Sequence, residues 1–170
     1  MTKHDCVQIL QSMNPPFLHY CIQSDEKIPF KKLSTQLPSH KIIKLDGNDF
    51  RDEKSLVDLC NKHMGLALGF TPNDTELHWM RFNDLIRTDI EMENHSGCII
   101  IVKNAENALR STSDGLVRFG NAMSLASLAY AKPDNLGLQP DYAEKPKSVH
   151  TILCYEKIPQ NAPNAALITF

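Results

Sequence analysis

The run Ile99-Ile100-Ile101-Val102 limits the folds that this chain can adopt more than any other stretch of the sequence. Four consecutive β-branched residues favour an extended strand, because branching at Cβ fits a pleated strand better than a helix. A strand with one face in water would alternate apolar and polar residues, and this run does not alternate. The run therefore predicts a strand that is buried on both faces, as in a parallel sheet.

The rest of the chain supplies strands and helices in an order that is typical of an α/β layer. Strands are predicted at residues 17–22, 41–47, 98–109 and 149–155, and helices at 5–13, 29–37, 52–64, 78–90 and 114–131. The tail at 160–170 is either loose or a late edge strand. The first two strands are joined by a short crossover, which favours their parallel pairing. We therefore expect an α/β fold, in which a small parallel sheet of three to four strands is packed with helices.

The composition is that of an ordinary globular protein, since 42% of the 170 residues are hydrophobic and 22% are charged. The net charge of −2 lacks the basic excess of a nucleic-acid-binding protein, so no direct nucleic-acid contact is predicted. No apolar run resembles a signal peptide or reaches the roughly 18 residues of a membrane span, so we expect a cytoplasmic protein without membrane contact. The five cysteines form no CxxC pair, which predicts buried free thiols in a reducing compartment.

The sequence lacks the spacings by which metal and cofactor sites are recognised. Its seven histidines form no HxxxH or HExxH pattern, and no glycine-rich phosphate loop occurs. We therefore predict no cofactor, no metal and no catalytic residue. An enzyme remains a rival interpretation, because Cys60, Cys98, Cys154 and several histidines and acids are present, although none of them forms a recognisable nucleophile–base pattern.

The stretch HWMRFNDLI contains the only tryptophan of the chain and is predicted to be helical. At about 100° per residue, Trp79, Phe82 and Ile86 share one face, which predicts a side that packs on the core. Asp84 lies nearly opposite, and Met80 lies one turn before it on the same outward side. Two interpretations of Asp84 are open: it is a solvated surface charge, or it is presented to a partner.

Acidic charge is concentrated around this helix. Between residues 69 and 95 there are six acidic residues and two arginines, although the whole chain has a net charge of only −2. The acidic residues are Asp74, Glu76, Asp84, Asp89, Glu91 and Glu93. Such a patch would speed the encounter with a basic partner and disfavour acidic partners.

The same stretch resembles the signature helix of the barstar family, whose members inhibit ribonucleases of the barnase type. The family pattern is an aromatic residue, Gly, any residue and Asn, then Trp-Asp-Ala-Leu, a variable residue, Asp and, two residues later, Leu. Four residues fit the Trp, the Leu, the second Asp and the final Leu of this pattern: Trp79, Phe82, Asp84 and Ile86. Asn83 fills the variable slot.

The resemblance extends over residues 41–155. KIIKLDG and the predicted helix at 52–64 match the family's first strand, turn and first helix. IIIVKNAENAL matches an apolar strand followed by Arg or Lys, Asn, Ala and an acid, and VHTILCY matches the closing strand. The resemblance thus implies a barstar-like domain at 39–156, with a strand–helix extension at 1–38 packed on it and a tail at 157–170.

Several of the family's binding residues are replaced in this chain. Met80 stands at the family's first acidic position, His78 at its Asn and Arg81 at its Ala. The loop before the helix becomes TPNDTEL, in which Asp74 and Glu76 are candidate replacements for the missing acid. Asp84 stands at the second Asp of the pattern and is unchanged. The candidate partner-binding residues are therefore Asp84, Met80, Asp74, Glu76, His78 and Arg81.

The resemblance implies an inhibitor rather than an enzyme. A ribonuclease active site is basic, because it binds phosphates and stabilises charge on a phosphoryl group. Carboxylates in the place of those phosphates can accept charge-assisted hydrogen bonds from the enzyme's arginines and block the site. We therefore expect Asp84 to enter the phosphate site of a basic ribonuclease or toxin nuclease, which would shield the producing cell. A second interpretation is a non-inhibitory interaction module on a barstar-like fold, with a partner other than a ribonuclease.

Overall fold

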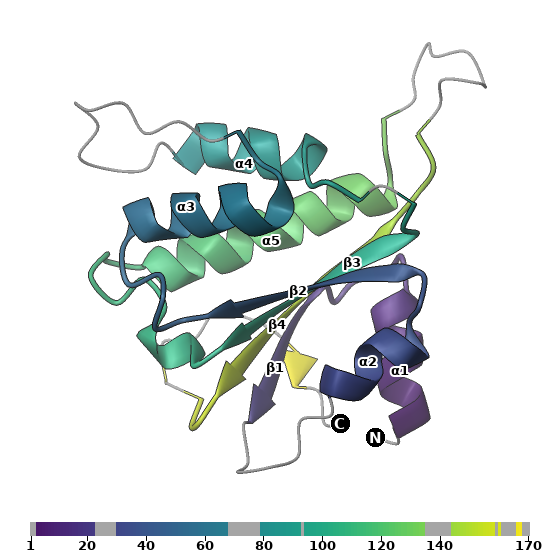
Figure 1. The fold of residues 1–170 in the computed structure, drawn as a ribbon, viewed down its shortest axis with the longest axis horizontal. Coiled ribbons are helices and arrows are strands. Elements are labelled where there is room, and N and C mark those ends of the chain that lie inside the picture. Colours follow the sequence, from purple (N-terminus) through teal and green to yellow (C-terminus); the bar gives the residue numbers. More distant parts are fainter. Residues whose placement is uncertain are drawn as a thin grey trace.

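The computed structural model describes residues 3–22, 30–67, 79–92, 94–134, 144–158, 160 and 166–167. Within them the chain forms one parallel sheet in the order β2-β3-β4-β1-β5, with helices on both faces (Figure 1). The strands are β1 (Leu18–Ile22), β2 (His40–Asp46), β3 (Gly97–Lys103), β4 (Ser148–Tyr155) and β5 (Ala166–Leu167). The predicted α/β fold with a small parallel sheet is confirmed, and the tail adds the short edge strand β5.

β3 and β4 occupy the interior of the sheet. Every residue of β4 is buried, and so is every residue of β3 except Lys103. Residues 98–102 of β3 are the register partners of 149–153 of β4. The two most apolar runs of the sequence are therefore neighbours in one parallel sheet, as expected from strands that have no face toward water.

The first two strands have the predicted direction but not the predicted pairing. β1 pairs with β4 and β5, whereas β2 lies at the far edge of the sheet beside β3. The direct pairing of β1 with β2, inferred from their short crossover, is wrong. The physical reason is that β3 and β4 are apolar throughout and take the interior, while β2 carries the partly exposed Lys41 and the exposed Lys44 and suits an edge.

Two layers of helices cover the sheet. α1 (Lys3–Gln11) and α2 (Phe30–Gln36) lie on one face, and α3 (Glu53–Met64), α4 (Trp79–Thr88) and α5 (Gly115–Ala131) lie on the other (Figure 1). A short 3₁₀ turn, η1 (Ala105–Asn107), follows β3. The five predicted helices and four predicted strands are all present, and their ends agree with the structure to within two residues with one exception. The strand predicted at 98–109 ends at Lys103, because the chain turns into η1 there.

The ends of α3 are set by side-chain and backbone features that the sequence indicates. The Asp52 side chain accepts a hydrogen bond of 2.9 Å from the backbone N–H of Ser55, and the Ser55 hydroxyl accepts one of 3.3 Å from the backbone N–H of Asp52. This capping box satisfies two backbone donors at the helix start. Gly65 ends the helix at φ 75°, a left-handed conformation that a Cβ would disfavour. The first turn of α3 is thereby fixed beside the sheet.

The two faces of the sheet bury separate apolar clusters. The larger cluster lies under α3, α4 and α5 and includes Phe82 and Phe119. The smaller cluster lies under α1 and α2 and includes Leu10 and Leu33. The buried side of α5 belongs to the larger cluster, where Phe119 and Met123 have no exposed surface. The sheet is thus covered on both faces, as its central strands require.

The cysteines are part of these clusters or of the helices above them. All five are buried and free of disulfides, which confirms their interpretation as small core residues. Burial raises the pKa of the Cys60 and Cys98 thiols to about 12. These two thiols therefore stay protonated and unreactive at neutral pH.

Amide hydrogen exchange tests the position of the central strands. We expect the amides of Ile100 and Ile152 to be among the slowest in the chain, because both lie in buried strands that open only on global unfolding. Native-state exchange followed by NMR measures this, with Leu167 in the two-residue edge strand as the reference. Fast exchange at both central positions would contradict the α/β arrangement.

Candidate protein-binding site

α4 presents two different faces, as the sequence predicts. Phe82 and Ile86 point into the larger core and have no exposed surface. Trp79 is half-buried rather than fully buried; it packs on this core and meets Phe82 edge-on, with ring centroids 5.4 Å apart. The apolar side of α4 therefore holds the helix in a fixed orientation on the domain.

Trp79 has a polar partner that the sequence pattern does not indicate. Its indole Nε1–H donates a hydrogen bond of 2.8 Å to Oε1 of Glu53, in the first turn of α3. Glu53 is buried, with 8% of its surface exposed. A buried carboxylate needs a donor, and the N-terminal end of a helix also favours negative charge. Trp79 is thus an anchor to the core and to the start of a second helix.

The outer face of α4 carries three of the residues that the barstar resemblance assigns to binding. Met80 is 71% exposed, and Arg81 and Asp84 are exposed on the same helix. Thr88 donates a hydrogen bond to the backbone carbonyl of Asp84 and leaves the side chain alone. Among the described residues, no hydrogen bond or ion pair involves the Asp84 carboxylate. This carboxylate is therefore accessible to a partner.

The other three predicted binding residues, Asp74, Glu76 and His78, lie outside the described residues. From the start of α4 to residue 92 the chain has three acidic and two basic side chains. They are Asp84, Asp89 and Glu91, and Arg81 and Arg87. The described part of this surface is thus only slightly acidic. The stronger acidic patch expected from the sequence depends on Asp74, Glu76 and Glu93, which lie outside the described residues.

Glu91 does not contribute a free charge to this surface. Nζ of Lys41 lies 3.5 Å from its carboxylate and donates a hydrogen bond of 2.8 Å to its backbone carbonyl. The backbone N–H of Glu91 in turn donates to the carbonyl of Met64 at the end of α3, over 2.8 Å. Glu91 therefore joins α3 to the edge strand β2, which is a structural role.

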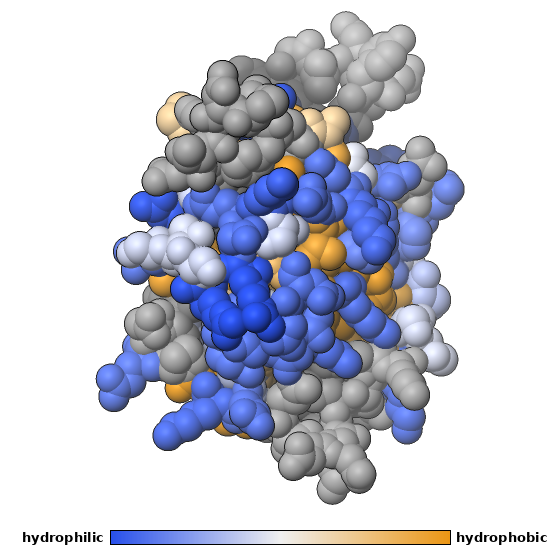
Figure 2. All heavy atoms as spheres, turned by 60° about the vertical axis from the view of Figure 1, so that its left-hand side comes forward, coloured by the Kyte–Doolittle hydropathy of each residue, from blue (hydrophilic) through white to orange (hydrophobic). Residues whose placement is uncertain are grey.

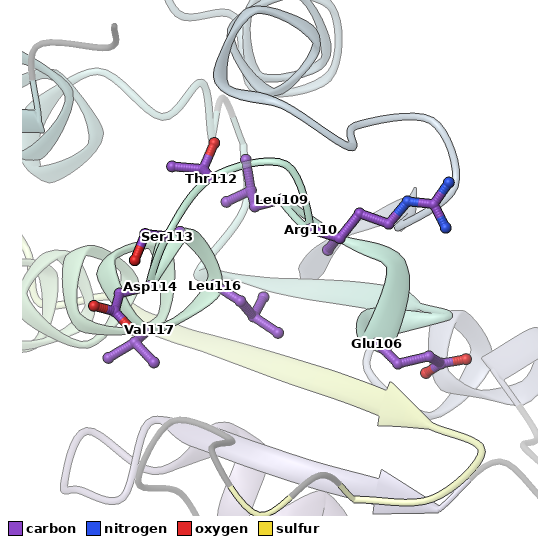
Figure 3. A pocket seen from close by; sticks show the side chains of 10 residues that line it. Glu106, Leu109, Arg110, Thr112, Ser113, Asp114, Leu116 and Val117 are labelled. Atoms are coloured by element: carbon purple, nitrogen blue, oxygen red, sulfur yellow. The ribbon is translucent and has the colours of Figure 1, made fainter.

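A second candidate site is a cavity of about 450 Å³ beyond the carboxyl end of β3 (Figure 3). It is lined by one continuous segment, from Glu106 to Val117. Figure 3 shows Glu106 and Arg110 at one side of the cavity and Asp114 at the other, so its charged groups do not converge. Ligand sites of α/β proteins bring polar groups together from several strand ends. The lining of this cavity comes from one segment and brings no such groups together. The described residues also contain no cluster of three potential metal ligands.

The side of the molecule on which α3, α4 and α5 begin has a mostly hydrophilic surface (Figure 2). Smaller apolar areas show between the polar side chains of the described residues. Permanent subunit interfaces are more apolar than this hydrophilic surface. The visible surface therefore suits a polar contact that forms and dissociates.

Comparison with known proteins does not place the chain in a family. No family model, no curated protein and no solved structure matches it. In the part of the chain that the structure describes, no helix is both long and apolar enough to cross a membrane. The candidate site accordingly rests on its own geometry, which is an anchored helix with an exposed carboxylate and an exposed methionine on its outer face.

Two histidines form a hydrogen-bonded pair under the opposite layer of helices, a feature that no spacing in the sequence indicates. His19 of β1 and His150 of β4 have no exposed surface, and their rings stack with centroids 5.2 Å apart. Nε2 of His150 lies 2.9 Å from the carbonyl oxygen of Ser12, so this nitrogen carries a proton and donates it. In a neutral ring Nδ1 of His150 is then the acceptor, and Nε2 of His19 donates to it over 2.9 Å.

Burial keeps both histidines of this pair neutral. Desolvation, and then the neighbouring His150, lower the pKa of His19 to about 3. Desolvation likewise lowers the pKa of His150 to about 4. Nδ1 of His19 is buried without a hydrogen-bond partner among the described residues, so a proton placed there would have no acceptor. The pair offers no accessible acid or base to a substrate.

A third histidine approaches a serine across the sheet. His40, Gly97 and Ser148 are register partners on β2, β3 and β4, and Nε2 of His40 lies 2.8 Å from Oγ of Ser148. A Cβ at Gly97 would lie 2.5 Å from that Oγ, so only glycine leaves room for the contact. The distance is that of a nucleophile and its base, but Ser148 is 1% exposed. The contact therefore holds three strands together.

Replacement of Trp79 tests its role as an anchor. We expect Trp79→Ala to lower the free energy of unfolding by about 2–4 kcal/mol, because it removes a half-buried ring and leaves the Glu53 carboxylate without its indole donor. Urea denaturation measures this. Met80→Ala, a truncation of an exposed side chain on the same helix, should change the same quantity by less than about 0.5 kcal/mol. Equal midpoints for wild type and Trp79→Ala would contradict the anchor role.

The histidine pair predicts a loss of stability in mild acid. Both folded-state pKa values, about 3 and about 4, lie below the ordinary value of 6.5, so the unfolded chain binds more protons once the pH falls below 6.5. The free energy of unfolding should therefore decrease from pH 6.5 toward pH 4, by about 1.4 kcal/mol per pH unit for each histidine. Urea midpoints at pH 7 and pH 5 measure the effect.

The matched variant for this experiment is His19→Gln, whose amide N–H can still donate to Nδ1 of His150 but does not titrate. Its midpoint should fall less than that of the wild type between pH 7 and pH 5. The same fall in both proteins would show that His19 is not a source of the pH dependence.

Proposed function

We propose that this chain is a barstar-like inhibitor that binds a basic ribonuclease or toxin nuclease through the outer face of α4. In this proposal Asp84 enters the phosphate-binding site of the enzyme, and the chain itself performs no catalysis. The enzyme is inactive while the complex lasts, because its arginines are occupied by a carboxylate that cannot react.

The order of the elements supports the proposal. The resemblance implies a strand, two helices, a strand and a closing strand, and these occur in this order as β2, α3, α4, β3 and β4. The two faces of α4 also agree with the helical geometry expected for HWMRFNDLI. Phe82 and Ile86 are fully buried, while Asp84 is exposed.

The observation that carries the proposal is the accessible carboxylate of Asp84 on an anchored helix. Trp79, Phe82 and Ile86 fix α4 on the domain, so Asp84 is presented in a defined direction. Its carboxylate has no ionic partner among the described residues and would give up none on binding. Because the backbone of α4 is already fixed, only the Asp84 side chain has to be ordered when it meets an arginine.

A second candidate function is an interaction module whose partner is not a ribonuclease, and the neighbours of Asp84 favour it. Met80 is 71% exposed where the family has an acid, and Arg81 adds a positive charge one turn before Asp84. The charge between α4 and residue 92 is therefore nearly balanced. A partner that is less basic than a ribonuclease, with an apolar patch for Met80, also fits this surface.

Truncation of Asp84 tests the binding face. Asp84→Ala should weaken the complex by about 2–5 kcal/mol, since it leaves the partner's arginine buried and unpaired; this is the usual magnitude for charged interfaces, those of the barstar family included. Isothermal titration with a purified barnase-type ribonuclease, and an RNA-hydrolysis assay, measure affinity and inhibition. Asp58→Ala, at an exposed aspartate of α3, is the matched control and should bind as the wild type does. If both variants and the wild type bind with equal affinity, α4 is not part of the interface.

Met80→Asp separates the two candidate functions. If Met80 stands where an inhibitor of barnase-type enzymes needs an acid, an aspartate at this position should strengthen inhibition of such an enzyme. If the surface is instead adapted to a less basic partner, the same variant should weaken the native complex.

The native partner is obtained by capture from the source cell with the wild-type chain, and Asp84→Ala serves as the negative control. A captured partner that hydrolyses RNA alone but not in the complex supports inhibition, and one without nuclease activity supports the interaction module.

A further inference from the structure

Two of the five cysteines, Cys21 and Cys154, lie side by side in the sheet. Cys21 of β1 is the register partner of Cys154 on the neighbouring parallel strand β4. Adjacent strands are about 4.8 Å apart, and a disulfide needs Cα atoms about 4.4–6.8 Å apart. Both side chains belong to the smaller core, under α1 and α2. The backbone thus already holds this pair at a spacing that a disulfide requires.

The two thiols also contact each other. A hydrogen bond between their side chains lowers the pKa of Cys21 and raises that of Cys154. The contact with Cys154 is the largest influence on Cys21 and lowers its pKa, whereas burial acts in the opposite direction and raises it. Because the thiolate is the reactive form of a cysteine, Cys21 is the candidate for the attacking thiol of the pair.

The surroundings of this pair differ from those of the other strand cysteine. Cys98 of β3 has Lys41 and Val149 as its register partners, so no second thiol lies beside it in the sheet. Cys21 is buried, but the next residue, Ile22, ends β1 and is 50% exposed. The Cys21 S–H also donates a hydrogen bond of 3.7 Å to the Ile22 carbonyl oxygen, at this end of the strand. Cys21 is thus one residue from the solvent-exposed end of β1, which a small oxidant can reach through a local opening of the strand end.

We propose that Cys21 and Cys154 form a reversible intramolecular disulfide when the folded protein meets hydrogen peroxide. The Cys21 thiolate attacks one peroxide oxygen, the O–O bond breaks, and Cys21 becomes a sulfenic acid while hydroxide leaves. The Cys154 sulfur then attacks the sulfenic sulfur, an S–S bond forms, and the hydroxyl group leaves as water with the proton of Cys154. The hydroxide takes up the proton that Cys21 has lost. Two thiols are thereby oxidised by two electrons, and one peroxide is reduced to two waters.

The disulfide would fasten the N-terminal strand to the interior of the sheet. It would close a loop from residue 21 to residue 154, which restricts the unfolded chain and raises the stability of the folded one. A thiol reductant would reverse the change. The pair is thus a redox-sensitive lock on β1, on the face of the sheet opposite to α4, and it does not depend on the proposed inhibitor function.

Thiol counting by mass spectrometry tests the proposal. The reduced full chain is treated with hydrogen peroxide, freed of it, unfolded and alkylated with iodoacetamide. We expect three alkylated cysteines instead of five, a peptide in which Cys21 is joined to Cys154, and five alkylated cysteines again after dithiothreitol. The urea midpoint of the oxidised protein should exceed that of the reduced protein.

Variants show whether the disulfide belongs to this pair. Cys21→Ala should retain all four of its thiols after peroxide, whereas the matched control Cys60→Ala should go from four to two. In Cys154→Ala, dimedone should label Cys21, because the thiol that resolves the sulfenic acid is missing. Five alkylated cysteines in the oxidised wild type, or a cross-link through Cys60 or Cys98, would overturn the proposal. An unchanged midpoint after the cross-link has formed would refute the lock on β1.

Discussion

β3 and β4 have no face that meets water, and this constraint determines most of the structure around them. Their backbone N–H and C=O groups are satisfied by neighbouring parallel strands, because water cannot reach them. Their side chains on both faces need apolar cover, which α1 and α2 provide on one side and α3, α4 and α5 on the other. Strands with charged or exposed residues are left for the outer positions, and β2 with Lys44 takes one of them.

The same constraint explains what the sequence reveals and what it does not. Residue type and spacing act locally, so the unbroken run at 99–102 predicts a doubly buried strand, and Asp52 and Gly65 predict the ends of α3. The choice of neighbours in a sheet is not local. β1 and β2 follow each other in the chain, but each competes for a place with strands that appear much later in the sequence. The apolar content of the strands decides which of them take the interior places. The short connection between β1 and β2 does not decide their pairing.

The candidate site also has features that local sequence pattern predicts and features that it does not. The outward position of Asp84 and the inward positions of Phe82 and Ile86 follow from helical geometry alone, and the structure agrees. The hydrogen bond between Trp79 and Glu53 joins two helices and does not follow from either one. Acidic residues are common in the first turn of a helix, so nothing in the sequence indicates that Glu53 is buried. Contacts between residues far apart in the chain are equally hidden, as for His19 and His150 or Cys21 and Cys154.

The position of β1 has a consequence for the order of events when the chain is made. Leu18 pairs with Thr151, so β1 leaves the ribosome long before β4, its neighbour inside the sheet, has been made. Such distant pairing makes folding slow, because a long loop must close before the contact forms. During that time the apolar strand LHYCI has free edges that can pair with other chains. Fast synthesis at high concentration therefore favours aggregation of this protein, and a chaperone that holds residues 18–22 until β4 emerges would raise the yield of the native sheet.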